Sequence, residues 1–436
     1  MPPESSSWRH RLWVAVFVAV VWLACFRFPA VWVATGIGEA HRPFMDLYGI
    51  LAANDAQRAG VDPFLPNDFD PYHRPHVYSN WWFALGWLGL GRSDTLWLGT
   101  VLVTVVLLIG VGLVRPGTRR EGIALLLLLV SPALLLAVNR ANNDLVVFVM
   151  ISLGLLCFRR EPWYWRALGI ILFAVSAVLK YSPLVTLIVL LDLRSRRALA
   201  AGLGLYGLVL LLAWPGLVQG WRSAPRFVPA PDWLYAYGAP VLLRNLGIHA
   251  ALGWLVPAIL LLVWAGVFGF GKMNDPEPPR SVQERTAERE FMCGAALVAG
   301  LFFLGSSYVY KLVFAVWLLP WLWRHGRVDR VELRWARAAW FLLLAVVWLE
   351  GGMAVVLNLF IGPWSLPIAQ GLLKATLILA QLATWALVAC LLRFLLIYCA
   401  RRARALWVNG GVNMGWASVS TPTHVADVDI GDHGQR

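Results

Sequence analysis

The chain has 436 residues, of which 59% are hydrophobic and only 14% are charged. A soluble domain usually has about a quarter of its residues charged and under half of them apolar, so the composition excludes an ordinary soluble protein. Several apolar runs approach or exceed the roughly 20 residues that cross the hydrocarbon core of a bilayer. The sequence therefore predicts an all-α polytopic membrane protein.

The net charge of +13 does not indicate a nucleic-acid partner, because Lys and Arg cluster between apolar runs. Such basic clusters mark the cytoplasmic side of membrane proteins. The five cysteines lie in or beside apolar runs and lack the spacing of metal ligands. We expect no metal site, no cofactor and no nucleic acid.

The first apolar run, 12–33, is long for a signal peptide and predicts an uncleaved span with a cytoplasmic N-terminus. It is followed by the polar segment 34–80, which holds six Asp or Glu and three Arg and suits the outer side. Within it, residues 45–60 have helical periodicity with one apolar side, and the Gly60-Val61-Asp62-Pro63 sequence ends the helix. The pattern predicts an amphipathic helix that lies on the membrane surface.

The rest of the chain alternates apolar segments with short polar turns, and basic turns on one side indicate that both termini are cytoplasmic. Residues 215–248 are expected to form a second outer loop, and residues 272–290 a cytoplasmic loop. About twelve membrane segments result, which makes 1–407 one membrane domain and 408–436 a polar, disordered cytoplasmic tail. The later segments are expected at 96–114, 122–138, 144–158, 167–180, 183–193, 198–214, 250–270, 291–305, 312–322, 338–358 and 370–397.

Ionisable groups at membrane depth or at its edge are functional hypotheses, and this chain has several at outer turns. Asp46 begins the predicted surface helix, where an acid is also favoured by the helix dipole alone. Arg140, Lys180 and Lys311 fall on the outer side against the positive-inside rule. Three cations there suggest an anion, with phosphate as the obvious candidate, although snorkelling also explains each lysine.

Asp68 and Asp70 offer carboxylate oxygens to a divalent cation, but the pattern is weak. An Asp before Pro71 is common in turns, so an ordinary turn is the simpler interpretation.

Four parts of the chain, in order over roughly residues 40–320, resemble the family 87 glycosyltransferases: the first loop and three later turns. The first loop carries Asp46-Leu47-Tyr48, Gly60-Val61-Asp62-Pro63-Phe64 and Tyr78-Ser79-Asn80. Later turns carry Asn139-Arg140-Ala141-Asn142-Asn143-Asp144, Leu179-Lys180-Tyr181-Ser182-Pro183-Leu184 and Ser307-Tyr308-Val309-Tyr310-Lys311-Leu312. Phe64 stands where the family has Tyr, and Tyr78-Ser79-Asn80 where it has Tyr-Pro-Pro.

The resemblance implies a GT-C-like helical bundle in the cell membrane, with its active site on the extracytoplasmic face. Such an enzyme moves a hexose, mannose in this family, from a polyprenyl-phosphate donor to a lipid-linked or cell-envelope glycan acceptor, with inversion. Asp46 is then the catalytic base. The expected substrate-binding residues are Tyr48, Asp62, Tyr78, Arg140, Asn142, Asn143, Asp144, Lys180, Tyr181, Tyr308, Tyr310 and Lys311.

Two other functions remain open on the sequence. A transporter or flippase for a lipid-linked or anionic substrate would also need outer cations, but it should carry polar groups deep within several spans. Most of the predicted spans lack charge, and the exceptions late in the chain are Glu350, Lys374 and Arg393. A membrane scaffold without catalytic activity would tolerate Asp46→Ala.

Overall fold

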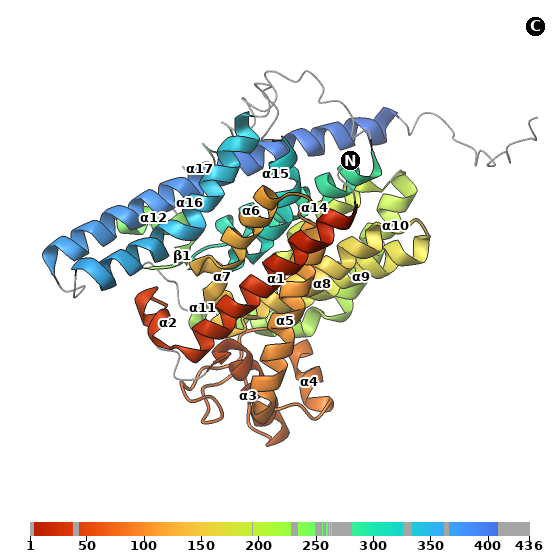
Figure 1. Ribbon diagram of the computed structural model, residues 1–436. Coiled ribbons are helices and arrows are strands. Elements are labelled where there is room, and N and C mark those ends of the chain that lie inside the picture. The colour runs from red at the N-terminus through yellow and green to blue at the C-terminus, as the bar shows by residue number, and fades with distance from the viewer. Residues whose placement is uncertain are drawn as a thin grey trace, which may run out of the picture.

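The computed structural model describes residues 4–37, 43–193, 195–227, 234–248, 281–325, 334–361 and 366–408, with four single positions between 255 and 263. These residues form a bundle of helices with one short β-ribbon (Figure 1). The predicted tail after residue 408 and nearly all of the predicted span at 250–270 lie outside the described residues.

The helical elements and the two strands follow the polar and apolar segments of the chain closely. They are α1 Glu4–Arg27, α2 Ala30–Ala34, α3 Met45–Arg58, η1 Asn80–Phe83, α4 Ala84–Trp87, η2 Arg92–Asp94, α5 Thr95–Val114, α6 Arg119–Leu129, α7 Pro132–Arg140, α8 Asn143–Phe158, α9 Trp163–Leu179, η3 Ser182–Asp192, α10 Arg196–Leu212, α11 Trp214–Phe227, β1 Ala236–Tyr237, α12 Ala239–Asn245, α14 Val282–Phe303, β2 Ser307–Tyr308, η4 Val309–Leu318, α15 Leu319–His325, α16 Arg334–Val356, η6 Leu357–Ile361 and α17 Pro367–Val408.

Four stretches of the described chain are long and apolar enough to cross a membrane: Trp8–Arg27, Arg92–Val114, Arg334–Ile361 and Pro367–Leu406. The number rises to six if each of two bent helix pairs, α6 with α7 and α10 with α11, counts as one span. The protein is therefore a helical, multi-pass membrane protein by length and composition. The count of about twelve membrane segments stays a prediction.

The bend of 55° between α6 and α7 has a local cause. Ser131 caps α7 by accepting a hydrogen bond from the Leu134 amide, and Pro132 occupies the first turn. Proline lacks the amide hydrogen that a continuous helix would need there, so a new helix starts at this point. The bend directs the C-terminal end of α7, with Arg140, toward the first loop.

Two predicted loops are partly helical. The expected outer loop at 215–248 contains most of α11 and all of α12. Pro215 does not prevent α11, because proline is tolerated in the first turn of a helix. The expected cytoplasmic loop at 272–290 gives way to α14 at Val282, where Ser281 and Glu284 form a capping box. Sequence periodicity missed this start because the first turns of α14 are rich in charge.

The charged residues of α14 are accommodated by ion pairs with neighbouring elements. Glu290 accepts hydrogen bonds from Arg159 at the end of α8, and Glu288 pairs with Arg401 of α17. Asp192, at the end of η3, pairs with Arg289 of α14 and also with Arg402. These pairs join four elements at the end of the bundle away from the first loop.

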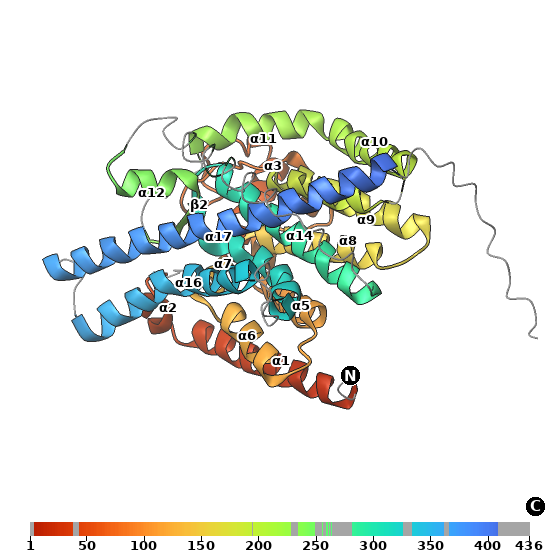
Figure 2. The same cartoon turned by 90° about the horizontal axis from the view of Figure 1, so that it is seen from above.

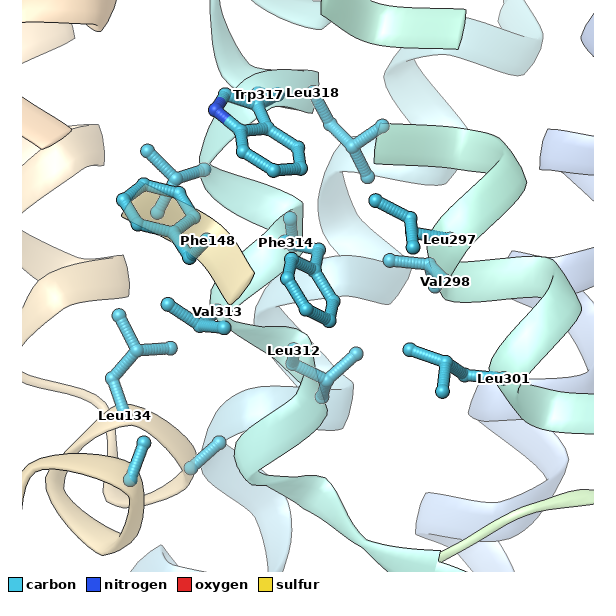
Figure 3. Close-up of a cluster of buried hydrophobic side chains, with 14 of the residues drawn as sticks. Leu134, Phe148, Leu297, Val298, Leu301, Leu312, Val313, Phe314, Trp317 and Leu318 are labelled. Carbon is cyan, nitrogen blue, oxygen red and sulfur yellow. The ribbon is translucent and has the colours of Figure 1, made fainter. Parts of the chain in front are cut away.

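The apolar core lies where η4 packs against α14 and α7. Figure 3 shows Phe314 and Trp317 of η4 between leucines and valines of α14 on one side and Phe148 of α8 on the other. The Phe148 and Trp317 rings stack with centroids 4.9 Å apart. This core fixes η4, the segment that follows strand β2.

The helix predicted at 45–60 is present as α3, but its apolar side faces protein. Leu47, Ile50, Leu51 and Ala53, which the periodicity placed on one side, are all buried. They pack on neighbouring parts of the bundle, and Figure 1 shows α3 and α4 grouped at the end of the bundle opposite the N-terminus of α1. The prediction of a helix that lies with this side on the membrane surface is therefore wrong.

Candidate functional site

Asp46 is fixed by the way α3 begins. Phe44 adopts a left-handed backbone conformation, with φ of 64°, and its amide donates to the Asn139 carbonyl at 2.8 Å. Its ring lies against Gly99 of α5, where a Cβ would come within 2.3 Å of the ring. Glycine at that position lets the ring enter, so the first turn of α3 comes to lie over the end of α7.

Arg140, at the C-terminal end of α7, holds the Asp46 carboxylate with two hydrogen bonds. Its Nε donates to Asp46 Oδ2 at 2.9 Å, and its Nη2 donates to Oδ1 at 2.7 Å. Asn142 Nδ2 adds a third hydrogen bond to Oδ2 at 2.6 Å, and Arg74 Nη1 lies 3.7 Å from Oδ1. A forked guanidinium on a carboxylate is a strong and orienting arrangement.

The charge state of Asp46 follows from these contacts. Burial alone would raise the pKa of this carboxyl group, but the charge and hydrogen bonds of Arg140, the Asn142 amide and the charge of Arg74 outweigh burial. The pKa of Asp46 therefore lies below its ordinary value of 3.8, and the group is a carboxylate at neutral pH.

The turn between α7 and α8 supplies the next group of polar side chains. Ala141 has a positive φ of 41°, and Asn142 Oδ1 caps α8 through the Asp144 amide at 2.9 Å. Lys180, from the end of α9, donates to Asn143 Oδ1 at 2.7 Å and pairs with Asp144 Oδ2 at 2.7 Å. Lys180 is thus neutralised by Asp144 behind the Asp46–Arg140 pair.

Aromatic rings from β2 and η4 close the other side. The Tyr308 and Tyr310 rings stack with centroids 5.5 Å apart, and the Arg140 guanidinium carbon lies 5.7 Å from the centre of the Tyr308 ring. Lys180 Nζ lies 5.8 Å from the Tyr310 ring and 5.9 Å from the Tyr78 ring. Cations over aromatic faces at these distances are stabilised, more so when desolvated.

A cavity of about 170 Å³ opens beside these groups. A single water needs only about 10–15 Å³ measured in this way, so the space admits a larger polar ligand or part of one. The lining residues come from the first loop, the end of α7, and β2 with the start of η4. They are Asp46, Gly49, Ile50, Asp70, Arg74, Pro75, His76, Val77, Tyr78, Arg140, Ser307, Tyr308 and Tyr310.

Five predicted site residues therefore line one cavity: Asp46, Tyr78, Arg140, Tyr308 and Tyr310. A second group adjoins them without lining it: Asn142 donates to Asp46, and Lys180 bonds both Asn143 and Asp144. Lys311 interacts electrostatically with Lys180 and Asp144. Two of the three cations that suggested an anion have acidic partners, since Arg140 pairs with Asp46 and Lys180 pairs with Asp144.

Three other predicted residues lie elsewhere. Tyr48 follows Asp46 by two positions in α3, so its side chain points to nearly the opposite face of the helix. There it is hydrogen-bonded to Arg92. Asp62 is exposed and caps a turn by accepting from the Phe64 amide at 2.9 Å. The Tyr181 hydroxyl lies beside Gly220 of α11, where a Cβ would come within 2.3 Å of it.

Arg74 and Asp70 were not among the predicted binding residues. Arg74 Nη2 donates to Asp70 Oδ2 at 2.8 Å and to the Met45 carbonyl at 2.9 Å. A Cβ at Gly49 would lie 3.1 Å from Arg74 Nη2, so a glycine inside α3 lets the guanidinium cross it. In the sequence, Gly49 within the predicted helix was the one local sign that another group approaches α3 closely. Asp70 therefore faces Arg74, whereas Asp68 pairs with His73 at 3.2 Å.

His76 also lines the cavity and carries a pH prediction. It is 4% exposed, packs on Phe64 and Phe83, and its Nε2 lies 3.1 Å from the Ser79 carbonyl. Burial lowers the pKa of His76 to about 4, so the folded protein binds its proton less readily than the unfolded chain does. Between pH 6.5 and about 4 the unfolded chain takes up the proton first, and the protein loses stability as the pH falls.

We expect this loss to reach at most about 3 kcal/mol, since each tenfold change in proton affinity is worth about 1.4 kcal/mol. Thermal unfolding of the protein in detergent, followed from pH 7.5 to 4, measures it. His76→Gln, which keeps a side-chain donor near Ser79, should flatten the profile over this interval. An unchanged profile in His76→Gln would contradict the assignment.

No family model, no curated protein and no solved structure matches this chain.

Proposed function

We propose that the protein is a membrane glycosyltransferase that moves a hexose from a polyprenyl-phosphate donor to a lipid-linked or cell-envelope glycan acceptor. The reaction takes place in the cavity beside Asp46, on the extracytoplasmic face of a GT-C-like bundle of about twelve membrane segments with both termini in the cytoplasm. Mannose is the proposed sugar. The observation that carries the proposal is the convergence of Asp46, Tyr78, Arg140 and Tyr308 from separate segments on one cavity.

Asp46 fits the role of a base that orients or deprotonates the acceptor hydroxyl. Its lowered pKa keeps it ionised at neutral pH, and its fixed position favours alignment of the acceptor. Of the two carboxylates that line the cavity, Asp70 is paired with Arg74 at 2.8 Å, and a single base, Asp46, suits single displacement with inversion at the anomeric carbon. The C–O bond to the donor phosphate then breaks as the acceptor oxygen forms its new bond.

The leaving group is a phosphate, so its developing charge needs cationic stabilisation. Arg140 lines the cavity and, with a side chain 33% exposed, has a face open to a ligand. Lys311 is a further cation near the site, where the charges of Lys180 and Asp144 act on it. Burial and the charges of Asp46 and Asp144 raise the pKa of Tyr78 well above its ordinary value of 10.0, so its hydroxyl stays protonated and can donate.

Sugar transfer by the purified protein tests the proposal. The protein in detergent is given radiolabelled polyprenyl-phosphate-mannose and a membrane lipid extract as the pool of acceptors, and the labelled product is separated from the donor. Transfer to a new lipid or glycan product is expected. A protein that transfers no hexose from any polyprenyl-phosphate donor, yet moves the donor across the bilayer of reconstituted vesicles, is a flippase instead.

A further inference from the structure

The position of Tyr308 at the cavity depends on a two-stranded ribbon. β1 and β2 pair antiparallel, with Ala236 opposite Tyr308, and the Val309 amide donates to the Tyr235 carbonyl at 2.9 Å. Tyr308 in turn lies against the Arg140 guanidinium, and Arg140 holds Asp46. Whatever holds β1 therefore also determines where Tyr308 lies relative to Arg140.

Two polar residues from the C-terminal helices hold β1. The Tyr235 amide donates to Glu350 Oε2 of α16, and Gln381 Nε2 of α17 donates to the Ala236 carbonyl at 2.9 Å. Gln381 Nε2 also lies 3.5 Å from Glu350 Oε1. Figure 2 shows α16 and α17 side by side. Through these contacts the pair reaches the ribbon.

The side chains that make these contacts are buried, and burying a polar side chain costs free energy unless it is hydrogen-bonded. Glu350 is 4% exposed and Gln381 is 1% exposed, and both lie in long apolar helices that are candidate spans. An ionisable group in such a helix is expensive and is kept where it serves a partner. Here the partner is main chain: Tyr235 has a φ of 63°, a left-handed conformation that a bulky residue adopts only when its surroundings hold it.

We propose that Glu350 and Gln381 are positioning residues for the candidate site, which hold β1 and thereby set Tyr308 against Arg140. Their effect on the donor rests on the proposed function, whereas their effect on the ribbon does not. Neither residue lines the cavity, so each acts only through the ribbon.

The effect on the ribbon is measured by thiol labelling at Ser307, which lies in β2 and lines the cavity. Ser307→Cys is introduced together with Cys399→Ser, because Cys399 is the one cysteine that is not buried. We expect Glu350→Ala to raise the rate of modification by a charged thiol reagent roughly tenfold, from the loss of a buried hydrogen-bond acceptor. Glu350→Gln, which keeps an acceptor for the Tyr235 amide, should stay within about twofold of the parent.

Thr384→Ala is the matched control, since Thr384 is buried in α17 near Gln381 but, within the described part of the chain, its hydroxyl bonds only the Ala380 carbonyl of its own helix. It should leave the labelling rate unchanged. A Glu350→Ala rate equal to that of the parent overturns the proposal, as does an equal increase in Thr384→Ala.

The kinetic test separates positioning from a general loss of folded protein. In Glu350→Ala we expect KM for the polyprenyl-phosphate donor to rise roughly tenfold with kcat little changed, and Tyr308→Ala added to it should cause little further loss. A fall in kcat at constant KM, as fewer folded molecules would give, contradicts the positioning role. If the wild-type protein transfers no sugar, the proposed function fails while the labelling result still decides the role of the ribbon.

Discussion

Replacing Asp46 with Asn is expected to lower kcat for sugar transfer by about a hundredfold to ten-thousandfold, the usual contribution of a positioned acid or base. Asn has nearly the same shape but accepts no proton, and it loses the charge that Arg140 binds at 2.7 Å. KM for the donor should change little, because the lost interaction concerns the acceptor hydroxyl in the transition state. Initial rates at saturating donor measure the effect.

Asp62→Asn is the control for this substitution. Asp62 lies in the same loop but is exposed, and an Asn side chain still accepts the Phe64 amide hydrogen bond. Its transfer rate should stay within about twofold of wild type, as for surface substitutions in general. Equal rates in Asp46→Asn and wild type would place the base elsewhere.

Replacing Arg140 with Gln is expected to reduce both stability and transfer. Removing one partner of a buried ion pair leaves the other charge uncompensated, which costs about 3–5 kcal/mol in a fully buried pair. We expect about 2–4 kcal/mol here, because the Arg140 side chain is 33% exposed whereas that of Asp46 is 13% exposed. Without Arg140, burial dominates and the pKa of Asp46 rises. Thermal unfolding in detergent measures the loss.

The double variant Asp46→Asn/Arg140→Gln supplies the decisive comparison. Two amides replace the two charges, so it should be more stable than Arg140→Gln alone although it is inactive. Arg140→Lys should lie between wild type and Arg140→Gln, because one ammonium replaces a forked pair of donors. Strictly additive losses in the double variant would show that the two side chains do not interact energetically.

Local patterns in the sequence were enough to locate the central element of the site. The periodicity of residues 45–60 predicted α3, and the unusual density of polar groups on turns predicted to lie on the outer side singled out Asp46, Arg140 and Lys180. Each of these signals involves neighbours within one helical turn or one short loop.

The pairing of these groups was not predictable, because it joins residues far apart in the chain. Asp46 and Arg140 are 94 positions apart, and Lys180 lies 37 positions from Asn143. From the sequence alone, Arg140 and Lys180 suggested binding sites for an anionic ligand. In the folded protein they pair with the acids Asp46 and Asp144. The same reason hid Arg74, whose role depends on Gly49 and Asp70 lying beside it.

The ribbon and its supports lay beyond sequence reasoning for a different reason. A two-residue strand such as β1 has no periodicity to detect. In the sequence, Glu350 is only a charge in a late apolar segment. The group that it binds, the Tyr235 amide, is 115 positions away, so the sequence could not reveal the contact.

A structure of the protein with a polyprenyl-phosphate hexose bound would test the central claim most directly. We expect the donor phosphate to lie against Arg140, with the sugar in the cavity between Asp46 and Tyr308 and the prenyl chain leading out to the bilayer. A donor whose phosphate and sugar lie away from this cavity, with Asp46 and Arg140 still paired and untouched, would contradict it.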